Sequence, residues 1–203
     1  MEAPVKYLVV DALERLIILL FSGPFAFAIF RALPMNPYWL LLGVSEGLAV
    51  ILILTRKPGG MTLRPYPWII GLAGTTLPLL IRPGDDAALV PMMVSTSLML
   101  AGVALNIAAK LFLNRSFGVV AANRGVKRGG PYRLVRHPMY LGYMLTQLGF
   151  LLSSFSLGNL LLYLVAWSFQ FLRIIEEERF LSLDPIYGSY RGRVKYRLLP
   201  GLI

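Results

Sequence analysis

The sequence predicts an all-α fold, a polytopic membrane helix bundle of about six spans with a C-terminal helical hairpin. Three observations support this prediction. The 203 residues are 57% hydrophobic and 15% charged, whereas a soluble domain usually carries about 25% charged residues. Six apolar runs recur along the chain, and basic residues concentrate in every second connection. The polar side chains are too few to cover an apolar core of this size in water. Part of the protein must therefore be surrounded by lipid.

The apolar runs fit the length of membrane spans, since a spanning helix needs roughly 20 apolar residues, within a range of about 17–25. The six runs are Asp11–Phe30, Tyr38–Thr55, Tyr66–Ile81, Ala87–Leu111, Pro138–Phe155 and Leu157–Ile175. The first begins with Asp11, Glu14 and Arg15 and lacks a small-residue cleavage site, so we expect a retained span and no signal peptide. The third is short and contains Pro78, so it is the weakest candidate.

The orientation follows from the lysines and arginines, which concentrate in cytoplasmic connections of membrane proteins. With six spans, one side holds Lys6, Arg15, Arg56, Lys57, Arg64, Lys110, Arg115, Arg124, Lys127, Arg128, Arg133, Arg136, Arg173, Arg179, Arg191, Arg193, Lys195 and Arg197. The opposite side keeps Arg31 and Arg82. We therefore expect an integral multi-pass protein with both termini in the cytoplasm. The net charge of +10 then suits an anionic bilayer surface, and no nucleic-acid partner is expected.

Two long segments share the predicted cytoplasmic side, the loop Leu113–Arg136 and the tail Glu176–Ile203. The fifth and sixth runs are joined by about one residue, which predicts a tight antiparallel hairpin. The open ends of this hairpin would bring loop and tail together into one pocket. No internal repeat or linker divides the chain, so residues 1–203 are expected to form a single membrane domain.

The stretch Gly129–Gly142 is the most informative in the chain. Pro138 suits the first turn of the fifth helix, which places Arg136 and His137 at the helix N-terminus. Free backbone N–H groups there favour an anionic ligand. Tyr140 follows within the first turn, and the final glycine allows a ligand or another helix to approach closely. The alternative is an interfacial anchor, because Arg, His and Tyr are common at the headgroup level.

A second polar stretch, Arg173–Leu181, follows the last apolar run and contains three successive glutamates, Glu176–Glu178. On a helix Arg173 and Glu177 share a face and could pair. The stretch is either a solvated continuation of the sixth helix or a carboxylate site for a ligand's hydroxyl or ammonium groups.

Glu46 lies midway through the second run, where a charge in the membrane is costly and often functional. Asn106 and Lys110 of the fourth run are possible partners. A protonated or paired structural glutamate is the alternative. We expect its side chain to face protein and not lipid.

Several chemistries are absent from the sequence. The chain has no cysteine and one histidine, which excludes disulfides, a cysteine nucleophile and a multi-histidine metal site. No G-x-G-x-x-G or P-loop is present, and no G-x-S-x-G or H-E-x-x-H. Any nucleotide-like cofactor must therefore be held by the helices and their cytoplasmic ends.

The motifs together resemble the isoprenylcysteine carboxyl methyltransferase family, and phospholipid N-methyltransferases share much of the same pattern. The resemblance rests on L-N-R-S-F-G at Leu113–Gly118, G-P-Y-R-L-V-R-H-P-M-Y-L-G at Gly130–Gly142, R-x-x-x-E-E-x-x-L at Arg173–Leu181 and Y-x-x-x-V-x-Y-R-L-L-P at Tyr190–Pro200. It covers about Leu105–Ile203, with Asn114 where the family often has glycine. Residues 1–86 would then be spans without motifs, and residues 87–203 a methyltransferase-like core.

This resemblance implies methyl transfer from S-adenosylmethionine to a lipid or lipidated acceptor, such as a prenylcysteine-like carboxylate or a phospholipid amine. The cofactor site that it implies consists of Gly130, Tyr132, Arg136, His137, Tyr140, Gly142, Glu177 and Glu178. Arg173 and Glu177 would be the catalytic residues, with Arg173 facing the acceptor. Neither the identity of the acceptor nor the oligomeric state follows from the sequence.

Two other functions remain open at this point. Membrane sterol and steroid reductases, which bind NADPH, also carry R-H-P-x-Y-x-G and a similar tail. The element of these reductases resembles R-H-P-N-Y, whereas this chain has Met139 in place of the Asn. The reductases also have R-D at the position where this chain has Glu176–Glu178. A non-catalytic lipid-binding membrane protein is the third alternative. Binding of S-adenosylmethionine, of NADPH or of neither would separate the three.

Overall fold

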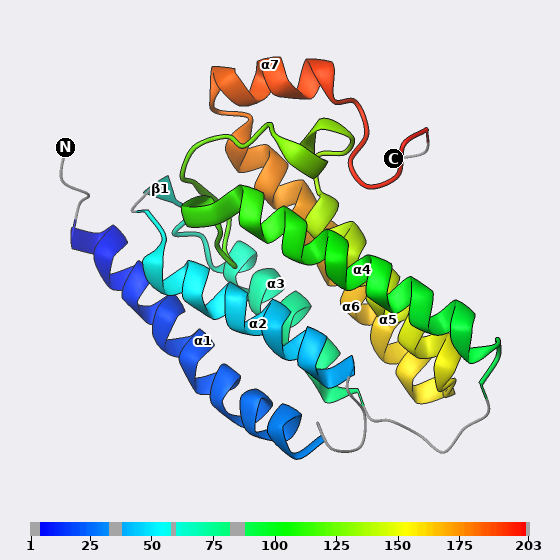
Figure 1. Ribbon diagram of the computed structural model, residues 1–203. Coiled ribbons are helices and arrows are strands. Elements are labelled where there is room, and N and C mark those ends of the chain that lie inside the picture. The colour runs from blue at the N-terminus through cyan, green and yellow to red at the C-terminus, as the bar shows by residue number, and fades with distance from the viewer. Residues whose placement is uncertain (1–4, 33–37, 58–59, 82–87, 202–203) are drawn as a thin grey trace.

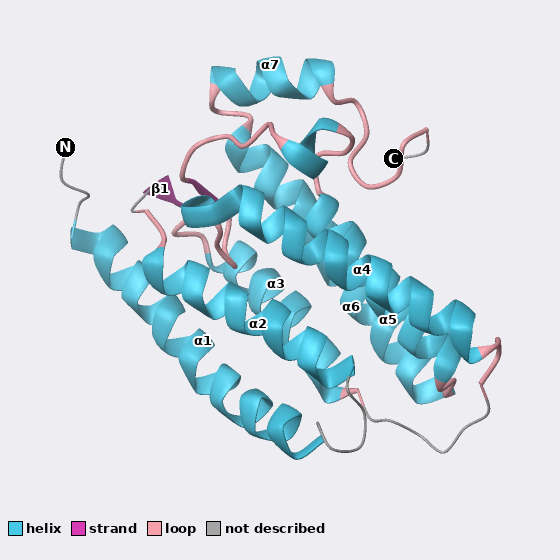
Figure 2. Ribbon diagram, viewed as in Figure 1, coloured by secondary structure: helices cyan, strands magenta, loops and turns pink. Residues whose placement is uncertain are grey.

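The computed structural model of the protein describes residues 5–32, 38–57, 60–81 and 88–201, and α-helices make up most of this part (Figures 1 and 2). The α-helices are α1 (Val5–Ala32), α2 (Tyr38–Thr55), α3 (Pro65–Thr76), α4 (Met92–Leu113), α5 (Pro138–Ser153), α6 (Leu157–Leu181) and α7 (Pro185–Arg193). Two-residue strands, β1 (Gly60–Met61) and β2 (Ala122–Asn123), pair antiparallel. The predicted helical fold is confirmed.

The apolar runs become helices with limits set by local sequence. Pro138 opens α5, and Ser156 caps α6 by accepting a hydrogen bond from the Asn159 amide at 3.1 Å. The third run is shorter than predicted: α3 has 12 residues, and a 3-10 turn, Leu77–Leu80, follows it. Pro78 accounts for the change, because proline has no N–H to continue an α-helix.

Among the described residues, two helical segments are long and apolar enough to cross a membrane, Met92–Ser116 and Leu157–Leu181. Six spans remain a prediction, and the residues between α3 and α4 that would bear on it, 82–87, lie outside the described part.

Successive helices from α1 to α6 run in alternating directions, so their connections gather at two ends of the molecule (Figure 1). We call the end that carries α7 the cap end. There the loop between α4 and α5 lies against the tail, because the Arg136 and His137 amides donate to the carbonyls of Tyr196 and Arg197 at 2.9 and 2.8 Å. The Tyr190 hydroxyl also donates to the Tyr132 carbonyl at 2.7 Å. Loop and tail thus form one structure, as the hairpin argument predicted.

Helices α4 and α5 touch closely through glycine. A Cβ atom added to Gly142 would lie 2.7 Å from the Asn106 nitrogen and 2.7 Å from the Gly102 oxygen. Gly142 thus faces α4 and allows the two helices to pack closely, while the cofactor-binding role expected for it stays a prediction. Asn106 reinforces the contact by donating to the Met139 carbonyl at 3.0 Å and accepting from Ser45 at 2.9 Å.

The expectation for Glu46 concerns a side chain that lies outside the described residues. Its proposed partners are described. Lys110 is fully buried, donates to the Ser45 carbonyl at 3.0 Å and lies 5.1 Å from the centre of the Tyr143 ring. A buried ammonium group is costly unless its protons are accepted, and these contacts stabilise it.

Candidate active site

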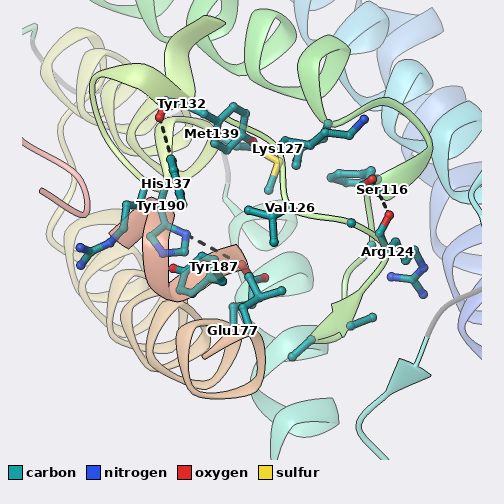
Figure 3. A pocket seen from close by; sticks show the side chains of 18 of the residues that line it. Ser116, Arg124, Val126, Lys127, Tyr132, His137, Met139, Glu177, Tyr187 and Tyr190 are labelled. Atoms are coloured by element: carbon teal, nitrogen blue, oxygen red, sulfur yellow. Dashed lines mark hydrogen bonds and ion pairs between the residues drawn. The ribbon is translucent and has the colours of Figure 1, made fainter. Parts of the chain in front are cut away.

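A cavity lies at the cap end, between the start of α5, the end of α6, the α4–α5 loop and α7, and its empty volume, open solvent included, is about 800 Å³ (Figure 3). We call it the cap cavity. Five of the residues predicted for the cofactor site line it: Tyr132, Arg136, His137, Tyr140 and Glu177. Their side chains come from loop, α5 and α6, so the fold brings together what the sequence separates.

The labelled polar side chains of the cap cavity lie in two groups. His137 and Glu177 lie on one side with Tyr187, while Arg124, Lys127 and Ser116 lie on the opposite side (Figure 3). The Tyr187 hydroxyl is buried and has no hydrogen-bond partner among the described residues. Such an arrangement suits a ligand with both a carboxylate and cationic or hydroxyl groups.

Glu178 does not line the cavity, although it was predicted to bind the cofactor. One of its carboxylate oxygens accepts from Arg136 Nε at 2.7 Å and lies 3.2 Å from His137 Nε2. The other oxygen accepts from Arg197 Nε at 2.9 Å. The carboxylate is therefore satisfied inside the protein. Its role is to fix Arg136, His137 and the tail in position, which orients the cavity wall.

Gly130, like Gly142, is a predicted cofactor residue that is not among the residues lining the cap cavity. Its φ of 55° lies in the left-handed region, which glycine adopts without steric cost. A Cβ atom at this position would clash with the Phe112 ring. Gly130 thus allows the loop to turn closely over the end of α4.

Glu177 faces the cap cavity with a side chain that is 20% exposed. It accepts hydrogen bonds from the Tyr140 hydroxyl and, at 3.2 Å, from Arg173 Nε. The Arg173 guanidinium also lies 5.3 Å from the centre of the Tyr140 ring. Glu177, Tyr140 and Arg173 therefore form one hydrogen-bonded group at the floor of the cavity.

Within this group, Arg173 is the member that does not border the cap cavity. Its remaining nitrogens donate to Thr75 Oγ1 at 3.2 Å and to the Gly118 carbonyl at 3.1 Å. It does not line the cap cavity but a second cavity deeper among the helices. Glu177 and Arg173 thus line different cavities, and their predicted roles toward cofactor and acceptor stay predictions.

The second cavity, here called the bundle cavity, has an empty volume of about 1490 Å³ and a mainly apolar wall built from α1 to α6. Phe117, Met139 and Tyr140 line both cavities. A small ligand at the cap end and an apolar ligand among the helices could therefore meet at these three side chains.

Four charged residues hold the loop that separates the cavities, and we call them the N-terminal ion cluster: Asp11, Glu14, Arg56 and Arg124. Glu14 Oε1 accepts from Arg56 at 2.8 Å and from the amides of Val119 and Val120 at 2.8 and 3.4 Å. The Arg56 side chain is fully buried and also pairs with Asp11 at 2.5 Å. Because Val119 lines the bundle cavity and Val120 the cap cavity, α1 and α2 fix the wall between them.

Arg124 belongs to both the ion cluster and the cap cavity. It lies 3.5 Å from Asp11, and burial together with the positive charge of Arg56 lowers its pKa to about 10. Sequence reasoning did not identify this cluster as part of the site. The available indication was the pair Asp11 and Glu14, three residues apart on one face of an apolar helix.

Residues 90–189, about half of the chain, match the family model described as Phospholipid methyltransferase. No curated protein matches the chain. The matched residues run from the start of α4 into α7 and contain the cap cavity's His137, Tyr140 and Glu177. The resemblance predicted from the motifs is thus confirmed over this region, which matches a family of membrane-bound methyltransferases.

Proposed function

We propose that the protein transfers a methyl group from S-adenosylmethionine to a lipophilic acceptor within the membrane. The observation that carries this proposal is the meeting of two cavities of different character at Phe117, Met139 and Tyr140, inside the region that matches the family. The match to a methyltransferase family favours this function over the reductase alternative.

The cap cavity is the proposed cofactor site, and its polar groups fit the cofactor's parts. The cationic side with Arg124 and Lys127 suits a carboxylate, as does the N-terminus of α5. Glu177 suits an ammonium group or ribose hydroxyls. The unpaired hydroxyl of Tyr187 supports the fit, because a buried polar atom without a partner needs one from a ligand or water.

The bundle cavity is the proposed acceptor site, entered sideways from the bilayer. When bound, S-adenosylmethionine supplies a methyl group on a positively charged sulfur. The residues of this chain then act by alignment: Tyr140 and Met139 separate the two ligands, and Arg173 orients the polar end of the acceptor. Alignment of two bound reactants and exclusion of water together account for a large part of such catalysis.

The proposed orientation has both termini and the cap end in the cytoplasm, which supports access of a soluble cofactor to the cap cavity. Gly158 and Gly188 are exposed positions at opposite ends of the bundle, and a Cβ atom meets nothing closer than 4.0 Å at either. Because the chain has no natural cysteine, single cysteines at these sites should label from opposite sides of an oriented membrane. Labelling of both from one side would contradict the six-span orientation.

Transfer itself can be tested without knowing the acceptor. Protein in nanodiscs is incubated with S-adenosylmethionine labelled in the methyl group, together with a total lipid extract. We expect label in the organic phase from wild-type protein and a loss of most of it from Glu177→Gln. The variant Glu176→Gln serves as the control, because Glu176 does not line either cavity. Equal labelling with and without the protein would contradict the proposal.

A further inference from the structure

Gln170 on α6 is a buried polar side chain that the proposed mechanism does not use. Only 4% of its surface is exposed, and it lines the bundle cavity. Its carbonyl oxygen Oε1 is buried and has no hydrogen-bond partner among the described residues. An acceptor atom in this condition is rare in a folded protein, since nearly all buried polar atoms are paired.

Other polar side chains of the same cavity already have partners within the protein. The hydroxyls of Ser22, Thr75 and Thr146 donate to main-chain carbonyls of their own helices at 3.1, 2.8 and 2.9 Å. Gln147 Oε1 accepts from the Trp167 indole at 2.6 Å. The Gln170 oxygen therefore differs from these neighbours: it is an unused acceptor on a side chain that lines the mainly apolar cavity.

We propose that Gln170 selects the acceptor, and that the acceptor carries a hydroxyl or amide N–H group on its otherwise apolar body. This inference rests on the proposed function of the bundle cavity. Gln170 lies three residues before Arg173 on α6, so the donor group sits about 4.5 Å deeper than the group that Arg173 orients. The acceptor class is therefore a lipophile with an internal hydrogen-bond donor.

This assignment gives the cavity a means of discrimination. A plain hydrocarbon or an ester-linked chain offers no donor and leaves the buried oxygen unpaired, whereas a hydroxyl or amide N–H satisfies it. Sites built to hydrogen-bond a ligand group reject analogues that lack the group much more strongly than apolar pockets discriminate by size. Gln170 would thus determine specificity, while Arg173 would orient the reacting end.

The test uses three lipophiles of matched shape, cyclododecanol, cyclododecanone and cyclododecane, each at equal mole fraction in nanodiscs that hold the full chain. Occupancy is followed by the fluorescence of Trp167, which stacks on the cavity residue Tyr163 at a centroid distance of 5.9 Å. For wild-type protein we expect the alcohol to bind at least about fivefold more tightly than the ketone or the hydrocarbon.

Two variants assign this preference to Gln170. Gln170→Met keeps the length of the side chain but removes the acceptor, so the preference for the alcohol should disappear. Ser168→Ala removes a hydroxyl on the exposed face of the same helix and should leave the preference unchanged. Equal binding of all three compounds to wild-type protein, tighter binding of the ketone, or a preference that persists in Gln170→Met would overturn the inference.

A parallel titration with S-adenosylhomocysteine keeps the two proposals distinguishable. Binding of this compound without any preference for the alcohol would leave the methyltransferase function standing and remove the role of Gln170. A preference for the alcohol without binding of S-adenosylhomocysteine would keep the role of Gln170 and remove the methyltransferase function. The bundle cavity would then serve a different chemistry.

Discussion

The two halves of the molecule both bury charged residues, but they satisfy them differently. In the N-terminal half, Glu14 accepts hydrogen bonds from Arg56 and from main-chain amides, and Arg56 also pairs with Asp11. In the C-terminal half, Glu177 is paired on one side and faces the cap cavity on the other. The comparison teaches that burial of a charge alone does not identify a ligand site. A charged group that also borders an open space is the better indication.

The largest expected effect is in the C-terminal half, at Glu178. Substitution of Glu178 by Ala leaves Arg136 and Arg197 without their shared carboxylate, and breaking a buried ion pair costs about 3–5 kcal/mol. Unfolding in mixed detergent micelles should show this loss. The neighbouring Glu176→Ala, whose ion pairs of 3.7 and 3.6 Å involve exposed arginines, should cost at most about 1 kcal/mol. Equal stability of the two variants would contradict the role given to Glu178.

The next effect tests the N-terminal half. Glu14→Gln keeps the shape of the side chain but removes the charge that Arg56 and two amides share, so we expect a loss of about 1.5–3 kcal/mol in unfolding free energy. Binding of S-adenosylhomocysteine should weaken as well, because the wall at Val119 and Val120 loosens. Arg15→Ala is the control, since its pair with Asp11 is partly exposed. If Glu14→Gln behaves like Arg15→Ala, the two halves are not coupled through this cluster.

A smaller effect separates the two cavities. Arg173→Lys keeps a positive charge but loses the fork that reaches Thr75 and the Gly118 carbonyl. We expect S-adenosylhomocysteine to bind nearly as tightly as to wild type. The kcat/KM for the lipid acceptor should fall about tenfold. If the variant also bound S-adenosylhomocysteine about tenfold more weakly, Arg173 would act on the cap cavity instead.

The smallest expected effect concerns Asp184, the residue that caps the N-terminus of α7. Hydrogen bonds from the Asn123 amide and the Ile186 N–H lower the pKa of Asp184. A lowered folded pKa means that this stabilisation is present above the unfolded value, about 3.9, and is lost as the pH falls through the folded value. Hydrogen exchange of α7 should therefore speed up at low pH beyond the intrinsic rate change, and Asp184→Ala should abolish that extra dependence. Ser189→Ala, on the exposed face of α7, should retain it.

The helices could be predicted because each depends on local sequence. Apolar length, Pro138 and Ser156 fix where α5 and α6 begin, and none of these indications requires a distant partner. The strand pair between Gly60 and Asn123 could not be predicted, since two-residue strands have no pattern of their own. Helix α7, Pro185–Arg193, was not predicted from the sequence either.

The site could be predicted in part for the same reason. His137 and Tyr140 lie in one short motif at a helix start, and Glu177 in another, so their local pattern indicated a ligand. The contacts of Glu14 join residues 42 to 106 positions apart and leave no local pattern. The contact of Gly142 with α4 could not be predicted, because the sequence shows that something approaches a glycine closely but not what approaches it.

The most direct test of the central claim is calorimetric titration of wild-type protein with S-adenosylhomocysteine and, separately, with NADPH. We predict binding of the first and none of the second. His137→Ala and Glu177→Gln should each weaken binding by about 1–3 kcal/mol, roughly fivefold to more than a hundredfold. Binding of NADPH alone would establish the reductase alternative. Wild-type affinity for S-adenosylhomocysteine in both variants would mean that the cofactor does not bind in the cap cavity.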